Sequence, residues 1–391
     1  ATLLWKELRV ALLNGLLKAF PPNITYPAVA HAFLAPLYHW MTSAKRYALH
    51  FVGETGSLKT SYACALLALF GPEFVNEEPP VKWGSTWKMI EVVGHEAKDV
   101  LFLADDYKPR LVPITNFMQV IHNYSDGSGR GRLNRDSTVQ ETKFIRGALL
   151  TTGEDLPQGE ASVAARLLVL HFQRQHGVNE PLAYAQQQAP HLNAAMFAYI
   201  RWLAETMPGK EAELDAYLIE QRDRFVRMAS HNATNAGRVA TNLAQNRLAW
   251  DTMGRWLVSR GVWSETEHER RLAEYDEIAL GIIQVMAQYI DEEKASAAFL
   301  RALKALLDSG QAVLLEKSKP DQDPTDRRIM LGWRDDDYVY LLRDVAYHAV
   351  ETWYAAEKKG LGFGMSAVEE QLIADGLLRP GAATDTHTIT A

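Results

Sequence analysis

The segment Gly53–Thr60 constrains the fold of this chain more than any other. It reads Gly-Glu-Thr-Gly-Ser-Leu-Lys-Thr, follows the apolar run Tyr47–Val52 and precedes the helical pattern Ser61–Phe70. A strand, a glycine-containing turn and a helix in this order form a phosphate cradle, because the turn frees backbone N–H groups and the helix adds its positive dipole end. The residues expected to bind a nucleotide are Gly53, Glu54, Thr55, Gly56, Ser57, Leu58, Lys59, Thr60 and Ser61.

Two side chains of this loop have distinct expected roles. Lys59 would reach the β- and γ-phosphates of a nucleoside triphosphate, and the Thr60 hydroxyl would ligate Mg²⁺. Leu58 departs from the usual pattern, in which a second glycine precedes the lysine, and brings a Cβ close to the phosphates. The alternative interpretation is a glycine-containing turn with an incidental lysine.

A second predicted strand leads into acidic residues. Val100–Ala104 is an uninterrupted apolar run, typical of a strand buried on both faces, and Asp105 and Asp106 follow it. Asp105 would hold Mg²⁺, while Asp106 would orient the water that attacks the γ-phosphate. Because Asp106 is one methylene shorter than the more usual glutamate, Glu154 and Glu91 are alternative candidates for the second role.

A third predicted core strand, Ile145–Leu150, is followed by the polar residues Thr151–Glu154. A polar side chain at this strand tip, such as that of Thr152, would sense the γ-phosphate and position the water. The last core strand is predicted at Ala165–Phe172. Strands and helices alternate over residues 49–172, which predicts an α/β fold with a mostly parallel sheet and helices on both faces.

The order of these segments resembles that of a known family. After the Gly53–Thr60 loop come Trp83–Thr86 with Ile90 and Glu91, then Leu103–Tyr107, Asp126–Asp136 and Leu150–Glu154. Over about residues 45–175 this order resembles the helicase-type P-loop ATPase module of mobile-element (plasmid and phage) primase-helicases, which are similar to superfamily 3 and AAA+ ring helicases. The resemblance implies ATP and Mg²⁺ as cofactors, an oligomeric ring, most often a hexamer, and ATP bound between subunits. It also implies single-stranded or forked DNA and a primase or other replication proteins as partners.

The segment from Asp126 to Gly147 places basic side chains among glycines. Ring helicases have, between the acidic strand and the polar-tipped strand, a hairpin that projects into the central pore. The resemblance therefore assigns nucleic-acid contacts to Arg130, Arg132, Arg135 and Lys143. Arg146, or Arg166 at the start of the last core strand, would reach the γ-phosphate of the neighbouring subunit. The alternatives are a solvated loop and, for Arg166, a plain surface arginine.

Composition limits the other function classes. The formal net charge of −7 argues against a protein that coats duplex DNA by charge alone, since such binding needs clustered Lys and Arg. No apolar run is long enough to span a membrane, so we expect no membrane partner. Cys64 is the single cysteine, which excludes an internal disulfide and fits a cytoplasmic location; in its helix it is expected to be a packing residue.

Outside the core the chain reads as mostly helical. We expect a helical N-terminal adapter over residues 1–46 with helices at 3–20 and 27–44, the P-loop ATPase core over 47–175, and a helical lid over 176–265 whose aromatic residues form a core. Helices followed by a short hairpin predict a winged-helix-like domain over 266–380, a fold that binds DNA or docks proteins. A disordered tail is expected over 381–391.

The leading hypothesis is an ATP-dependent DNA helicase or translocase that acts as an oligomeric ring in replication of a mobile genetic element. An alternative of a different class is a nucleotide-binding P-loop scaffold that assembles and docks partners without translocating DNA. Leu58 and the Asp105–Asp106 pair favour this alternative. A small-molecule kinase is a weaker third option, because such enzymes seldom combine a glycine- and arginine-rich loop with a winged-helix-like tail.

Overall fold

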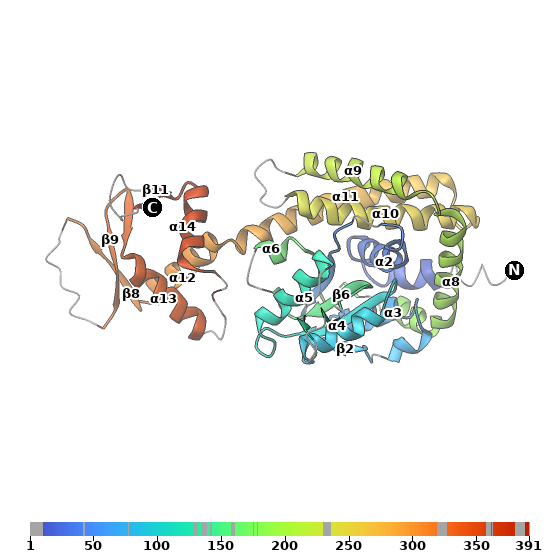
Figure 1. Cartoon of the computed structure of the whole chain (residues 1–391), viewed down its shortest axis with the longest axis horizontal. Coiled ribbons are helices and arrows are strands. Elements are labelled where there is room, and N and C mark those ends of the chain that lie inside the picture. Colours follow the sequence, from blue (N-terminus) through green and yellow to red (C-terminus); the bar gives the residue numbers. More distant parts are fainter. Residues whose placement is uncertain are drawn as a thin grey trace. The chain divides into compact units, whose positions relative to one another are not determined.

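The computed structural model describes residues 11–41, 44–76, 78–127, 132–133, 139–140, 143–157, 161–174, 176–177, 179–229, 236–318, 327–356, 361, 363–379 and 388–390. The chain divides into two compact units. The first comprises residues 1–157 and 162–288, and the second comprises residues 158–161 and 289–391. Figure 1 shows the helices and strands of both units.

The first unit is built around a sheet of five parallel strands (Figure 1). The strands are β1 (Ala48–Gly53), β2 (Val81–Lys82), β3 (Leu101–Tyr107), β6 (Ala148–Gly153) and β7 (Leu167–Phe172). They lie in the order β2-β3-β6-β1-β7, and every neighbouring pair is parallel. Almost every residue of β1, β3 and β6 is buried, as the apolar runs indicated. The predicted α/β fold with a parallel core sheet is confirmed.

Two strands extend further along the chain than their apolar runs suggested. β3 continues through Asp105 and Asp106 to Tyr107, and β6 begins only at Ala148 but continues to Gly153. Parallel pairing of β3 with β6 joins Ala104 to Thr151 and resumes, after a bulge, at Tyr107. Main-chain pairing therefore carries the polar residues into the strands, whereas the sequence placed them after the strands.

The N-terminal part of the first unit differs from the two expected helices. Residues 11–18 form a π-helical turn η1 (Ala11–Gly15) and a 3₁₀ turn η2 (Leu16–Lys18), in place of the described part of a helix over 3–20. Helix α2 (Pro22–Leu37) begins five residues before the expected 27, because proline fits the first helical position, where its missing N–H is not needed. α2 is buried on nearly every side, which is typical of a core helix.

Buried polar contacts attach α2 to the sheet and to a later helix. His31 on α2 contacts the Leu149 carbonyl through Nε2 at 3.0 Å and the Tyr47 hydroxyl through Nδ1 at 3.1 Å. Asn246 on α10 (Ala236–Ser259) donates to the Pro27 carbonyl at 3.0 Å and to the Tyr47 hydroxyl at 2.7 Å. The N-terminal helix, the sheet and α10 therefore share one core.

Shorter helices connect the core strands. They are α3 (Lys59–Leu67), η3 (Pro72–Asn76), α4 (Trp87–Glu96), α5 (Ile114–Asp126) and α6 (Ala161–Ala164). Cys64 is buried within α3, as expected of a packing residue. A search of the described helices finds none with the length and apolar character needed to cross a membrane.

A helical part completes the first unit with α7 (Asn179–Gln187), α8 (Ala189–Thr206), α9 (Glu211–Met228), α10 and most of α11 (Glu265–Glu292). Its aromatic residues form a core: Tyr199 and Trp250 are fully buried, and Trp250 stacks on Tyr26 of α2 at 4.2 Å. Phe197 on α8 is an exception, since 63% of its surface is exposed. The expectation of an aromatic core holds for the buried stripe and is wrong for Phe197.

The second unit contains α12 (Ala295–Asp308), α13 (Arg343–Ala356) and α14 (Met365–Ala374) beside a second five-stranded sheet. The strands are β8 (Ala312–Glu316), β9 (Ile329–Arg334), β10 (Tyr338–Leu341), β11 (Leu378–Arg379) and β12 (Thr388–Thr390). β9 and β10 form an antiparallel pair, whereas β8 and β9 are parallel. Gly332 has a φ of +144°, and a Cβ there would lie 1.9 Å from the Tyr340 carbonyl oxygen, so the hairpin requires glycine.

The second unit bears on two of the sequence expectations. Its helices and antiparallel pair are elements that a winged-helix domain also contains, and the assignment to that fold stays a prediction. Residues Thr388–Thr390, expected in a disordered tail, instead form β12, which pairs with β10 and β11. Backbone pairing on both sides of β12, which lies between β11 and β10, explains this difference, because the Thr- and Ala-rich composition gave no strand signal.

Candidate nucleotide site

The predicted phosphate loop lies at the carboxyl edge of the parallel sheet. β1 ends at Gly53, β6 at Gly153 and β3 at Tyr107, and parallel strands end at the same edge. The strand order places β6 between β1 and β3. In strand order, the polar end of β6 therefore lies between the loop after β1 and the acidic residues of β3.

The loop from Glu54 to Leu58 has the backbone of a tight turn. Gly56 has a φ of +82° and Leu58 a φ of +63°. Leu58 is the residue before α3 and adopts the left-handed conformation that glycine accepts without steric cost. A Cβ added at Gly177 would lie 3.0 Å from Leu58 Cδ1, so the leucine side chain lies against this glycine. The sequence departure at Leu58 is therefore accommodated by a left-handed leucine.

Lys59 begins α3 and is 9% exposed. Its ammonium donates a hydrogen bond to the Glu54 carbonyl at 3.3 Å. Burial lowers the pKa of Lys59, while Glu154, Asp105 and Asp106 act in the opposite direction. The Lys59 ammonium is therefore attracted by acidic residues at the carboxyl ends of β3 and β6.

Asp105 joins the phosphate loop to β6. Its Oδ1 accepts hydrogen bonds from the Thr60 hydroxyl at 3.1 Å and from the Thr152 hydroxyl at 2.5 Å. Thr152 Oγ1 in turn accepts from the Asp106 N–H at 3.0 Å. Thr60, Asp105 and Thr152, which the sequence assigned to metal and nucleotide, thus form one connected group from three elements.

Asp106 has an unusual environment that the sequence did not reveal. Its φ is +62°, at the bulge between Ala104 and Tyr107, a conformation that costs a non-glycine residue roughly 1–2 kcal/mol. Its carboxylate pairs with Lys108 at 2.9 Å. Sequence reasoning missed Lys108, although its position two residues after Asp106 at the same strand end was an available signal.

Thr55, at the tip of the loop, is held from two sides. Its hydroxyl donates to Glu154 Oε1, and its carbonyl accepts from Arg174 Nε at 3.1 Å. Arg174 also lies 3.6 Å from the Glu54 carboxylate. It was not among the predicted site residues, but it follows β7, which ends at the same sheet edge.

Glu91, the other alternative to Asp106, has a different setting. It is buried on α4, and its carboxylate accepts a hydrogen bond from Asn123 of α5 at 2.6 Å. Burial raises the pKa of Glu91. Among the contacts described, this residue links two helices rather than joining the group around Asp105.

The two arginines expected to act on a neighbouring subunit precede their strands. Arg146 Nε donates to the His95 carbonyl at 2.6 Å, two residues before β6. Arg166 precedes β7, donates to the Ser162 carbonyl at 2.7 Å and lies 3.6 Å from Asp126. The amino ends of the strands are the sheet edge opposite the phosphate loop. Neither arginine is therefore beside the nucleotide loop of its own chain, and their action in trans stays a prediction.

The glycine- and arginine-rich segment contains a short hairpin. β4 (Arg132–Leu133) pairs antiparallel with β5 (Val139–Gln140). Arg130 and Arg135 lie outside the described residues, and for Arg132 the backbone alone is described. Lys143 is exposed and pairs with Glu96 of α4 at 3.2 Å. The assignment of these four residues to nucleic acid stays a prediction.

Comparisons with known proteins support the fold. No family model matches the sequence, and a search of curated proteins gives no match. A solved structure titled "SCCmec type IV Cch - active helicase" matches over 100% of this chain and 70% of its own, with a TM-score of 0.65 and 11% identity. A structure of JCV helicase bound to a small molecule covers 73% of this chain and 65% of its own at 17% identity, but its TM-score of 0.25 is too low to indicate a shared fold. The first match shows a P-loop NTPase fold for the core.

Proposed function

We propose that this protein is an ATP-dependent DNA helicase or translocase. The observation that carries the proposal is the group of Thr60, Asp105 and Thr152, in which one carboxylate oxygen accepts from the phosphate loop and from the intervening strand. Such a group couples the nucleotide loop to the strand that would position the attacking water. The SCCmec structure that shares the fold is titled an active helicase, which supports the choice of helicase among P-loop functions.

The residues of the loop fit ATP and Mg²⁺. Ser57 is 1% exposed and, among the described residues, its hydroxyl has no hydrogen-bond partner, as expected where a phosphate oxygen would accept from it. Thr60 and Asp105 offer the hard oxygen ligands that Mg²⁺ prefers. Mg²⁺ would neutralise charge on the phosphates when bound. Lys59 would bind the β- and γ-phosphates from the opposite side.

The remaining roles concern the attacking water. Thr152 would orient it from the end of β6, with Asp106 or Glu154 accepting its proton. If Asp106 has this role, Asp106→Asn retains Mg-ATP binding and loses hydrolysis. The reverse result, a nearly silent Asp106→Asn and an inactive Glu154→Gln, would move the role to Glu154.

We further propose a ring, most often a hexamer in similar proteins, with Arg146 or Arg166 reaching the nucleotide of the next subunit. The β4–β5 hairpin, with Arg130, Arg132, Arg135 and Lys143, would contact single-stranded or forked DNA in the pore. Replication of a mobile genetic element in the cytoplasm, with a primase or other replication proteins as partners, is the setting that the family resemblance suggests.

The test is ATP turnover with Lys59→Ala, with Lys88→Ala on α4 as the matched control. Loss of the buried lysine should lower turnover by roughly 10²–10³-fold, because one charge-stabilising contact to the transferred phosphoryl group is removed. Lys88 is exposed, and its loss should leave turnover unchanged. Wild-type turnover should also depend on Mg²⁺ and rise with single-stranded DNA. Normal turnover by Lys59→Ala would refute the site assignment.

One observation favours the scaffold alternative. The Asp106 carboxylate is already paired with Lys108 at 2.9 Å, so Lys108 competes with a water for contact with this carboxylate. A scaffold would assemble on binding ATP and hydrolyse it slowly, whatever nucleic acid is added. Sizing of the protein with and without ATP, combined with turnover at low salt with single-stranded DNA, separates the two functions.

A further inference from the structure

A basic cavity lies in the first unit, apart from the nucleotide loop. It has a volume of about 570 Å³ and is lined by α9, the first turns of α10 and residues 44–45 before β1. Three of its lining residues are cationic, Lys45, Arg222 and Arg238, and one is acidic, Asp215. The excess of positive charge suits an anionic ligand.

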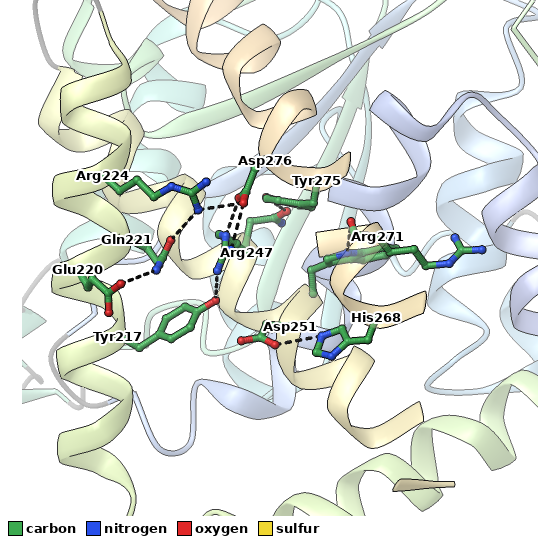
Figure 2. A network of polar contacts seen from close by, with 12 residues as sticks. Tyr217, Glu220, Gln221, Arg224, Arg247, Asp251, His268, Arg271, Tyr275 and Asp276 are labelled. Atoms are coloured by element: carbon green, nitrogen blue, oxygen red, sulfur yellow. Dashed lines mark hydrogen bonds and ion pairs between the residues drawn. The ribbon is translucent and has the colours of Figure 1, made fainter. Parts of the chain in front are cut away.

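The orientation of α9 is fixed by a polar network on its other side. Figure 2 shows Tyr217, Gln221 and Arg224 of α9 facing Arg247 of α10 and Asp276 of α11. Arg247 contacts Asp276 at 2.6 Å and also the Tyr217 hydroxyl, while Arg224 lies 2.9 Å from Asp276. Because this face of α9 is held against α10 and α11, the stripe with Asp215 and Arg222 is directed to the cavity.

Two polar atoms of the cavity lining are buried without a hydrogen-bond partner among the described residues. Gln245 is 0% exposed; its Nε2 donates to the Lys45 carbonyl at 2.8 Å, which fixes the amide and leaves Oε1 unpaired. Arg238 donates to Ser125 through Nη2, whereas its Nε is unpaired. Burial and nearby Arg166 lower the pKa of Arg238. Asp126, which lies 3.6 Å from Arg166, acts in the opposite direction, and a ligand anion would add to this compensation of the like-charge pair.

Hydrogen bonds connect the lining of the cavity to both ends of the segment that carries the β4–β5 hairpin. Ser125, just before that segment, accepts from Arg238 and donates to the Arg46 carbonyl at 2.7 Å. Arg46 donates to the Arg146 carbonyl, at the segment's other end. Arg238 contacts Ser125, and Lys45 precedes Arg46 in the chain. Both cations therefore lie beside residues that hold the two ends of the predicted DNA-binding segment.

We propose that this cavity binds the phosphodiester backbone of a single nucleic-acid strand, extending the path of the strand from the hairpin segment. The proposal rests on the proposed function. Phosphate oxygens would accept from Lys45, Arg222 and Arg238 and from N–H groups in the first turn of α10. The unpaired Gln245 oxygen would accept from a ring N–H or amino group of a base. The hydrogen bonds that connect the cavity lining to both ends of the hairpin segment favour a strand over a free nucleotide as the occupant.

The test compares two double variants in strand binding, measured by fluorescence anisotropy with a labelled oligo-dT over a range of salt. Lys45→Ala with Arg222→Ala removes two exposed cations of the cavity, and Arg201→Ala with Arg227→Ala removes two exposed cations outside it. Losing two phosphate contacts should reduce the slope of the log binding constant against the log salt concentration by about 1.4. The ratio of the wild-type binding constant to that of the cavity pair should therefore fall about sevenfold between about 50 and 200 mM salt. The control pair should behave as the wild type.

A second measurement separates failure of this inference from failure of the proposed function. In a Lys59→Ala background, which removes the lysine of the phosphate loop, inorganic pyrophosphate should raise the thermal midpoint, and the cavity pair should abolish this shift. If the wild type binds oligo-dT and the cavity pair binds it equally, the inference is wrong and the helicase proposal survives. If the wild type binds no strand, the strand occupant is overturned, and a Lys45- and Arg222-dependent pyrophosphate shift assigns the cavity to a free phosphate compound.

Discussion

Leu58 gives a prediction in which glycine should stabilise the fold more than alanine, the reverse of the usual order. Its φ of 63° and ψ of 13° lie in the left-handed region, and it immediately precedes α3. A Cβ in that conformation costs roughly 1–2 kcal/mol. Alanine recovers roughly 0.4–1 kcal/mol relative to glycine, because it restricts the unfolded chain. Leu58→Gly should therefore exceed Leu58→Ala in free energy of unfolding by about 0.5–1 kcal/mol.

The comparison of the two variants isolates the Cβ, since both lose the leucine side chain that lies against Gly177. The assay is urea unfolding, with the shift in midpoint multiplied by a common slope. The control is Ala216→Gly on the exposed side of α9, where glycine should cost roughly 1 kcal/mol in the ordinary direction. An alanine variant at 58 that is as stable as the glycine variant, or more stable, would refute the left-handed conformation before α3.

Three further predictions follow from other contacts. Thr152→Val should lower ATP turnover roughly 10–100-fold, because Asp105 and the Asp106 N–H lose the hydroxyl that both contact. Turnover is measured with Mg-ATP in excess. Turnover at the wild-type rate would show that the hydroxyl does not help to position Asp105 and Asp106. Arg247→Met should lower the free energy of unfolding by roughly 2 kcal/mol, because partly buried Asp276 keeps Arg224 but loses the hydrogen bonds from Arg247 (Figure 2). Arg270→Met, at an exposed ion pair, should cost less than about 1 kcal/mol. Burial lowers the pKa of His31 from 6.5 to about 4, so the folded state binds a proton at His31 less tightly than the unfolded state does. Above pH 6.5 the neutral His31 does not reduce the free energy of unfolding. As the pH drops from 6.5 toward 4, the free energy of unfolding should fall by about 1.4 kcal/mol per pH unit because of this histidine. Unfolding of His31→Gln at pH 4, 5 and 6 checks this, since the variant should show a shallower loss; identical slopes would assign the acid sensitivity to other groups.

The local elements of the core could be predicted from the sequence. The apolar run before Gly53, the glycines and the following helical pattern specify a strand, a turn and a helix through short-range preferences alone. The runs before Asp105 and Thr151 specify buried strands in the same way. These patterns also named Lys59, Thr60 and Asp105, because their roles depend on position at a strand or helix end.

The sequence could not place the residues that reach the site through strand order or backbone conformation. Insertion of β6 between β1 and β3 brings Thr152 to Asp105, and this pairing is a long-range choice that no local pattern encodes. Lys108 and Arg174 become site residues only because β3 and β7 end at the same edge. Their charges alone look like those of any exposed cation.

Residue types and periodicity thus determined the strand–loop–helix unit and the parallel α/β class, and they predicted phosphate binding by the loop. Tertiary structure alone decided that α2 is a core helix, that Leu58 is left-handed and that Asp106 is paired. It also placed Lys45, Arg222 and Arg238, which are far apart in sequence, around one cavity. The physical reason is that local preferences act over one turn or strand, whereas pairing and burial depend on which distant segments meet.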